Sequence, residues 1–274
     1  MNDFLQDLST SSLITAIEEN LFFAISTSRH WSRAEFHDDA EIKWSMTDIP
    51  FPLFNSIWKA QLPPERIDTT IRTLIAQAKS RKVPLLWWMG PSTQPNDLAR
   101  HLERYGFTSD GQIPGMAVNL TTLNENLPIP TGLIIQRVED HKILKQWNQV
   151  FAAGFGLPDF AADAFYDYMC AIDLDTTPAY IGWLDNQPVA TSLLVLAGGI
   201  AGIYNVATLP RVRRQGIGAI MTLTPLREAR NRGCRVGILQ ASQMGVGVYR
   251  TLGFQEYCKI SQYVWSPDHQ PEAG

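Results

Sequence analysis

The chain has 274 residues, of which 45% are hydrophobic and 18% are charged, and its formal net charge is −4. This length corresponds to about two domains, and the hydrophobic share is ample for their cores. The acidic balance argues against binding to nucleic acid or to an anionic membrane, and no apolar run reaches the roughly 18 residues that cross a bilayer.

The N-terminal stretch Met1–Asp7 lacks the basic flank and apolar core of a signal peptide. The cysteines form an odd and scattered set, Cys170, Cys234 and Cys258, which favours a reducing compartment over a disulfide framework. The five histidines show no metal-ligand spacing. We therefore expect a cytoplasmic protein without a metal.

The first half contains one strand–helix–strand pattern. Val83–Ser92 holds an apolar strand, Asp97–Glu103 has helical character, and Tyr105-Gly106-Phe107 follows. Asn124–Gly132 then places two prolines and a glycine between apolar segments, which is typical of a linker. We expect one domain over residues 1–127 and another over 131–267.

The second half alternates strands and helices in a regular order. The patterns predict a strand, two helices, a hairpin around Asp185–Pro188 and, after Gly198-Gly199, another strand. In chain order these are Leu133–Val138, Glu139–Phe155, Asp159–Ile172, Ala179–Leu184 with Val189–Leu196, and Ile200–Thr208.

Val206–Thr222 reads as the end of a strand, a basic loop with two glycines and the start of a helix. Such a junction directs unpaired backbone N–H groups and the positive end of the helix dipole at one point, which suits a phosphate. The stretch lacks the lysine of a P-loop, and Met221 stands where a dinucleotide fingerprint needs a small residue. Leu226–Gly233 then ends a helix, and Arg235–Gln240 reads as a short buried strand.

Two motifs in this half resemble those of the GNAT acetyltransferase superfamily. Arg213-x-x-Gly216-x-Gly218 resembles the family's pyrophosphate loop, and Ala241–Phe254 is similar to its second motif, which ends in Tyr-x-x-x-Gly-Phe. The resemblance covers Leu133–Trp265 and implies an α/β (α+β) fold of the GNAT acyl-CoA N-acyltransferase type, with elements in the order β-α-α-β-β-β-α-β-α-β.

The first half resembles a degenerate copy of the same unit, which implies a tandem arrangement. Tyr105-Gly106-Phe107 stands against Leu252-Gly253-Phe254, and Ala78–Lys82 against Ala229–Gly233. Leu62–Ile67 then occupies the place of the phosphate loop, with no glycine, two prolines without N–H groups and one carboxylate, while Leu102 replaces the motif tyrosine. We expect no acetyl-CoA site there; the alternative is an unrelated α/β cap domain.

The resemblance implies transfer of an acetyl group from acetyl-CoA to a primary amine of a small molecule or peptide, with oligomer formation left open. It also implies that Ile203–Thr208 splays from Val236–Gln240 to admit the pantetheine arm. The alternative is a non-catalytic acyl-CoA-binding or interaction module. The residues expected to bind the co-substrate are Val206, Ala207, Thr208, Arg213, Arg214, Gln215, Gly216, Ile217, Gly218, Ala219 and Ser242.

Tyr249 is the candidate general acid, because a phenol stays protonated at neutral pH and can donate to a thiolate. The alternatives are a tyrosine that only packs on the core and, for Ser242, a simple helix cap. The base is open between Tyr204, a water relay, Asp159 and Asp163, and Asn205 either orients the acceptor or bonds to backbone. Two further groups are left open between the acceptor site and an ordinary role in the core or at the surface: Phe155, Phe160 and Phe165, and Asp159, Asp163, Asp167, Asp173 and Asp175.

Overall fold

The computed structural model describes residues 4–267, which divide into two compact units. Unit 1 consists of the residues up to Ala24 together with Pro114–Cys258, and unit 2 of Ile25–Ile113 together with the residues from Lys259 onward. These units do not follow the expected boundary between residues 127 and 131. Across residues 4–267, none of the helices combines the length and the apolar character that spanning a bilayer requires.

The sheet of unit 1 has the strand order β6-β7-β8-β9-β10-β5, and its neighbours are antiparallel except for the parallel pair β9 and β10. The strands are β6 (Leu133–Arg137), β7 (Ala179–Leu184), β8 (Gln187–Ala197), β9 (Ile200–Thr208), β10 (Val236–Gln240) and β5 (Thr108–Asn119). The hairpin between β7 and β8 turns on Asp185 and Asn186 alone, both with positive φ, as a two-residue turn of this hand requires. Pro188, expected in that turn, lies in β8.

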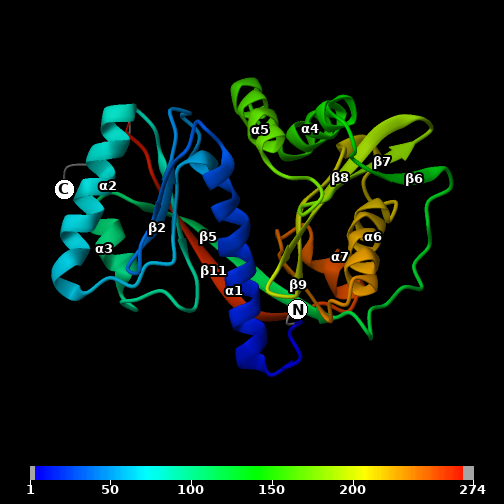
Figure 1. Ribbon diagram of the computed structural model, residues 1–274, viewed down its shortest axis with the longest axis horizontal. Coiled ribbons are helices and arrows are strands. Elements are labelled where there is room, and N and C mark those ends of the chain that lie inside the picture. The colour runs from blue at the N-terminus through cyan, green and yellow to red at the C-terminus, as the bar shows by residue number, and fades with distance from the viewer. Residues whose placement is uncertain (1–3, 268–274) are drawn as a thin grey trace. The chain divides into compact units, whose positions relative to one another are not determined.

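Helices cover both faces of this sheet (Figure 1). They are α1 (Thr10–Ser26), α4 (His141–Phe155), α5 (Asp159–Ala171), α6 (Ile217–Asn231) and α7 (Val246–Thr251), and a short 3-10 turn, η4 (Pro210–Val212), precedes α6. A Cβ on Gly237 would meet Leu226 of α6, whereas a Cβ on Gly202 would meet Asn20 of α1. The residue paired with Gly237 directly precedes Gly202 in β9. Because side chains alternate along a strand, positions 237 and 202 face opposite sides of the sheet, so α6 and α1 lie on opposite faces.

Unit 2 contains the strands β1 (Glu35–Asp38), β2 (Lys43–Met46), β3 (Ser56–Trp58) and β4 (Leu85–Met89), with β11 (Gln255–Trp265) as the neighbour of β4. Helices α2 (Ile67–Arg81) and α3 (Leu98–Arg104) lie together beside these strands in Figure 1. Three 3-10 turns, η1 (Thr27–His30), η2 (Pro52–Phe54) and η3 (Pro64–Arg66), complete the unit. The predicted strand–helix–strand pattern of the first half is confirmed as β4, α3 and β5.

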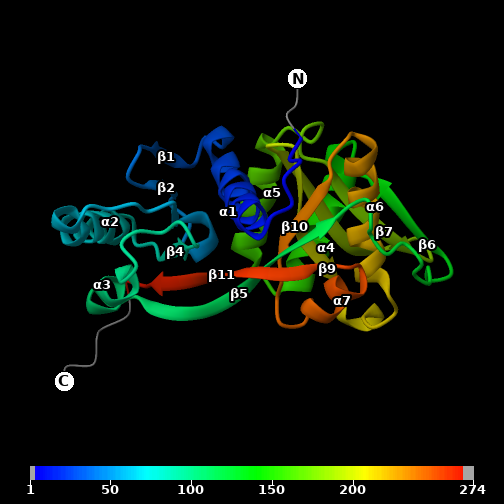
Figure 2. The ribbon, with the colours of Figure 1, turned by 90° about the horizontal axis from the view of Figure 1, so that it is seen from below.

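The last strand of each half of the chain completes the unit formed mainly by the other half. Residues Gly115–Asn119 of β5 pair with β10, and Ser261–Trp265 of β11 pair with β4. Figure 2 shows β5 and β11 running along each other, and Gln112 donates to the hydroxyl of Ser261 at 3.0 Å. Helix α1 is likewise assigned to unit 1 as far as Ala24. A cut in the linker therefore separates strands that pair with each other.

Candidate active site

The centre of the site is a fork between two parallel strands. β9 and β10 pair from Ile200 with Val236 to Gly202 with Ile238, and β9 continues to Thr208 without pairing to β10. The predicted splay of Ile203–Thr208 from Val236–Gln240 is thus confirmed. Beyond Gly202, β9 has no pairing with β10, which leaves the β10 side of its backbone suited to an extended ligand.

A bulge in β9 lies within the fork. Thr191 is opposite Ala207 and Leu193 is opposite Tyr204, so two residues of β9, Asn205 and Val206, face one residue of β8. Asn205 has a φ of +52°, and its carbonyl oxygen accepts a hydrogen bond from the Thr191 hydroxyl at 2.8 Å. The bulge turns the backbone at Val206, Ala207 and Thr208, the part of the strand expected to bond the thioester arm.

The loop after β9 leads directly into α6, a helix of 15 residues. Gly216 is the residue before the helix and has a φ of +82°, a conformation that favours glycine. In the described part of the chain, the backbone N–H groups from Arg214 to Gly218 donate to no protein acceptor, whereas those of Arg213 and Ala219 donate to Pro210 and Gly216. Five adjacent free amides at the positive end of a helix have the geometry that suits an anion.

The two loop glycines have different requirements. A Cβ on Gly216 would lie 3.6 Å from the carbonyl oxygen of Pro128, an ordinary contact, so its backbone conformation rather than crowding requires glycine. Gly218 has no positive φ, and a Cβ there would lie 3.7 Å from the Thr208 hydroxyl. Gly218 therefore leaves space between the helix and the end of β9.

The side chain of Arg213 is turned into the protein. Its Nε donates to the carbonyl oxygen of Thr208 at 2.9 Å, and one terminal nitrogen donates to that of Gly154 at 3.1 Å. Arg213, one of the residues expected to bind the co-substrate, therefore directs its charge toward backbone carbonyl groups of the protein. The exposed Arg214, with a φ of +63°, has no ion pair with another described residue and supplies the free charge beside the loop.

Tyr249 lies in α7 and is 9% exposed. Its ring packs over Gly245, where a Cβ would come within 2.8 Å of it, and meets the Phe254 ring edge-on at 6.0 Å. Burial raises the pKa of Tyr249 to about 12, so the phenol keeps its proton at neutral pH. This protonation state fits a general acid, and the ring packing fits the structural alternative equally.

The hydroxyl of Ser242 accepts the Gly245 N–H at 3.2 Å, and the Ser242 carbonyl accepts the N–H groups of Gly245 and Val246. These bonds support the alternative that Ser242 shapes the turn into α7.

The candidate bases are placed very differently. The Tyr204 hydroxyl donates to Oδ1 of Asn20 at 2.8 Å, and burial raises the pKa of Tyr204, so the phenol is a neutral donor rather than a ready base. Asp159 and Asp163 are exposed on α5. Asp175 pairs with Arg137 at 3.1 Å, and Asp173 bonds the turn that follows it.

The three candidate phenylalanines differ in burial. Phe165 is buried, with its ring 4.4 Å from that of Phe151, and belongs to the core. Phe155 and Phe160 are 54% and 48% exposed on either side of the turn between α4 and α5. This turn adjoins the fork, because Gly154 approaches Ala207 so closely that a Cβ would lie 2.7 Å from the alanine methyl group.

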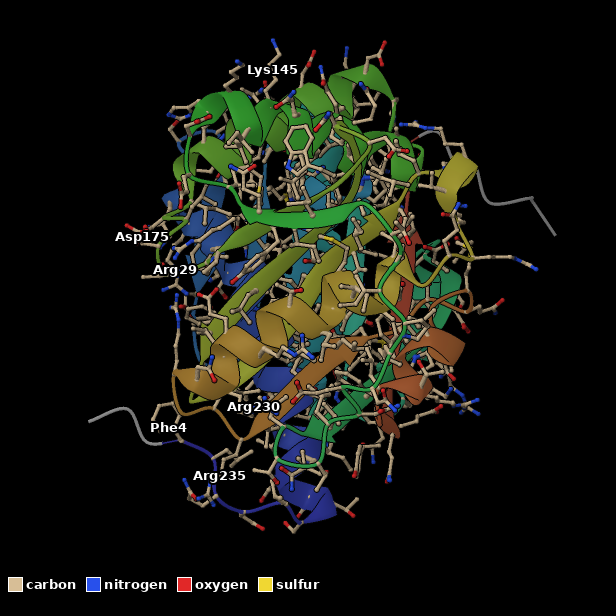
Figure 3. The ribbon with its side chains drawn as sticks, turned by 90° about the vertical axis from the view of Figure 1, so that its right-hand side faces the viewer. Phe4, Arg29, Lys145, Asp175, Arg230 and Arg235 are labelled. Atoms are coloured by element: carbon tan, nitrogen blue, oxygen red, sulfur yellow. The ribbon has the colours of Figure 1, made fainter. Side chains whose placement is uncertain are left out.

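Two features of the site could not be recognised from any motif in the sequence. Asn20 reaches the fork from a helix about 180 residues away along the chain, and no local pattern marks such a contact. The linker is fixed on unit 1, since Glu125 pairs with Arg230 and, at 2.6 Å, with Arg227, which lowers the pKa of Glu125. Figure 3 labels Arg230 on α6. Residues 4–267 contain no group of three or more potential metal-ligating side chains.

Comparison with known proteins agrees with the resemblance seen in the sequence motifs. Residues 143–254 match the model of the acetyltransferase (GNAT) family. A GCN5-related N-acetyltransferase from Kribbella flavida is similar in fold, with a TM-score of 0.71, 18% identity and coverage of 97% of this chain and 98% of that one. A tandem GNAT protein from the clavulanic acid biosynthesis pathway gives a TM-score of 0.58, 12% identity and coverage of 97% of both chains. No curated protein shows significant sequence similarity to the chain.

Proposed function

We propose that this chain, whose residues 143–254 form a domain of the GNAT acetyltransferase family, is an acetyl-CoA-dependent N-acetyltransferase acting on a primary amine. The observation that carries the proposal is the adjacency of the fork and the five free amides of the loop. The fork suits an extended amide-bearing arm, and the helix terminus suits a pyrophosphate. Acetyl-CoA combines both groups in one molecule.

The amides from Arg214 to Gly218 would hold the pyrophosphate, and the exposed Arg214 would add charge attraction. The backbone of β9 beyond the bulge, at Val206 and Thr208, would bond the arm and polarise the thioester carbonyl. Positioning the amine beside this carbonyl supplies much of the rate enhancement, because the reaction becomes effectively intramolecular.

The amine nitrogen attacks the carbonyl carbon, and the carbon–sulfur bond then breaks to release the CoA thiolate. The excess proton leaves the nitrogen through a water relay, because Tyr204 is a protonated phenol whose hydroxyl already donates a hydrogen bond to Asn20. Tyr249 would protonate the thiolate, for which its protonated state at neutral pH is suited.

A thiol-release assay with acetyl-CoA against a library of amines tests the proposal. Gly216→Val should abolish binding of CoA, measured as a rise in melting temperature, because valine cannot adopt the loop conformation. Tyr249→Phe should lower turnover about 100-fold or more with little change in affinity for CoA. Binding without turnover on any amine would favour a non-catalytic acyl-CoA-binding module.

We further propose one site per chain. In unit 2, the segment before α2 contains Pro63 and Pro64, neither of which has an N–H group, and Leu102 is fully buried in the core of that unit. Calorimetry with acetyl-CoA should therefore give one binding event, which Gly216→Val removes. Two binding events per chain would contradict the expectation that the first half has no acetyl-CoA site.

A further inference from the structure

Helix α1 contacts both strands of the fork just beyond the point where they separate. Tyr204 on β9 and Gln240 on β10 each lie two residues past the last paired rung. The Tyr204 hydroxyl donates to Oδ1 of Asn20 at 2.8 Å, and Nε2 of Gln240 donates to the carbonyl oxygen of Ile17 at 3.3 Å. One helix thus binds one side chain from each strand.

The environment of the Asn20 side chain is specific to an asparagine. Its side chain is 1% exposed, and Nδ2 lies 3.3 Å from the carbonyl oxygen of Val195 and 3.4 Å from that of Ile200. Gly202 lies directly beneath it, and any Cβ there would collide with Oδ1 of Asn20. A buried amide is tolerated only when its polar atoms are bonded, and here both ends of the amide have partners.

The helix itself is firmly seated around this contact. Leu13, Ala16 and Ile17 are buried in one cluster with side chains of β9 and β10, among them Ile200 and Ile238. Movement of α1 relative to the fork would open this close-packed cluster. The distances from α1 to the two strands are therefore fixed together.

We propose that α1 is a brace across the fork, with Asn20 and Gln240 as positioning residues that set the separation of β9 from β10. This inference rests on the proposed function, because the channel so defined would receive the pantetheine arm of acetyl-CoA. The helix N-terminus proposed for the pyrophosphate belongs to α6, on the opposite face of the sheet. The brace thus acts on the arm and leaves the nucleotide end of the ligand unaffected.

Calorimetry with two ligands tests this assignment: CoA, and 3′-phospho-ADP, which is the nucleotide end without the arm. Asn20→Ala and Gln240→Ala should each weaken CoA binding about tenfold and change binding of 3′-phospho-ADP by less than about twofold. Tyr204→Phe, which removes only one hydroxyl, should act in the same direction and serves where Asn20→Ala does not fold.

The matched control is Asn148→Ala. Asn148 is also buried, and its amide donates to the carbonyl oxygen of Ala162 at 2.9 Å, between α4 and α5. This variant should lower the melting temperature while leaving both affinities unchanged. Equal losses for both ligands in the Asn20 and Gln240 variants, or folded variants with full CoA affinity, would overturn the brace. A wild-type protein that binds neither ligand would overturn the proposed function, and the brace with it.

Discussion

The guanidinium of Arg213 donates to the carbonyl oxygen of Gly154 at 3.1 Å, which ties the loop before α6 to the end of α4. A second bond, to the carbonyl oxygen of Thr208, holds the end of β9 in the same place. The first basic residue of the loop motif therefore stabilises the loop, while the next one, Arg214, is exposed to solvent.

Arg213→Ala should lower the free energy of unfolding by about 1–3 kcal/mol, because two hydrogen bonds from a charged donor are lost. Arg214→Ala should change it by less than about 0.5 kcal/mol but weaken CoA binding, and this loss should shrink at high salt. Urea unfolding and CoA titration at two salt concentrations measure both effects. Equal stability losses in the two variants would contradict the division of roles.

Gly216→Ala and Gly247→Ala form a matched pair. Alanine at position 216 must adopt a φ of +82°, which should cost about 1–2 kcal/mol of stability. Gly247 lies in α7 with nothing within 4 Å of an added Cβ, so alanine there should raise stability by up to about 1 kcal/mol. Thermal unfolding of both variants checks the opposite signs, and a stable Gly216→Ala protein would show that the left-handed loop is not required.

The burial of Tyr249 predicts a pH dependence of stability. Its pKa of about 12 in the folded protein lies above the value near 10 of an unfolded tyrosine, so the folded state holds the proton more tightly. The contribution is fully present below about pH 10 and is lost as the pH rises toward 12, by an amount on the order of 3 kcal/mol. The free energy of unfolding of Tyr249→Phe should therefore fall less over this alkaline range than that of the wild type. Parallel curves for wild type and variant above pH 10 would contradict it.

A chain that starts at Thr131 should be poorly soluble. It lacks β5, which pairs with β10, and the residues Leu13, Ala16 and Ile17 that cover the apolar face of β9 and β10. Residues 1–127 and 131–274 expressed together as separate chains should form a soluble complex, because each supplies a strand to the other. Size-exclusion chromatography decides the outcome, and full stability and activity of the second half alone would show that it does not need β5 and α1.

Local patterns in the sequence were sufficient for much of the second half. Amphipathic periodicity predicts α4 and α5 to within two residues, and the glycine pattern around Gly216 correctly places a loop before α6. The separation of β9 from β10 also agrees with the expectation from the family resemblance.

Contacts between distant parts of the chain could not be read in the same way. The pairing of β5 with β10 depends on which edge of the sheet is open, and no residue within either strand encodes this. The Arg213 guanidinium is directed by two backbone carbonyl groups, which carry no signature in the sequence. In the sequence, Asn20 is an ordinary polar residue of a helix, and only the structure shows that it packs against Gly202.

The placement of β11 in unit 2 has a consequence for how the protein is made. The segment that pairs with β4, Ser261–Trp265, follows Pro114–Cys258 of unit 1 in the chain, so unit 2 lacks this strand until those residues have been synthesised. Folding on the ribosome therefore cannot finish the first half before the second half emerges. A premature stop codon after Phe254 would remove β11 entirely and leave β4 of unit 2 without this neighbour.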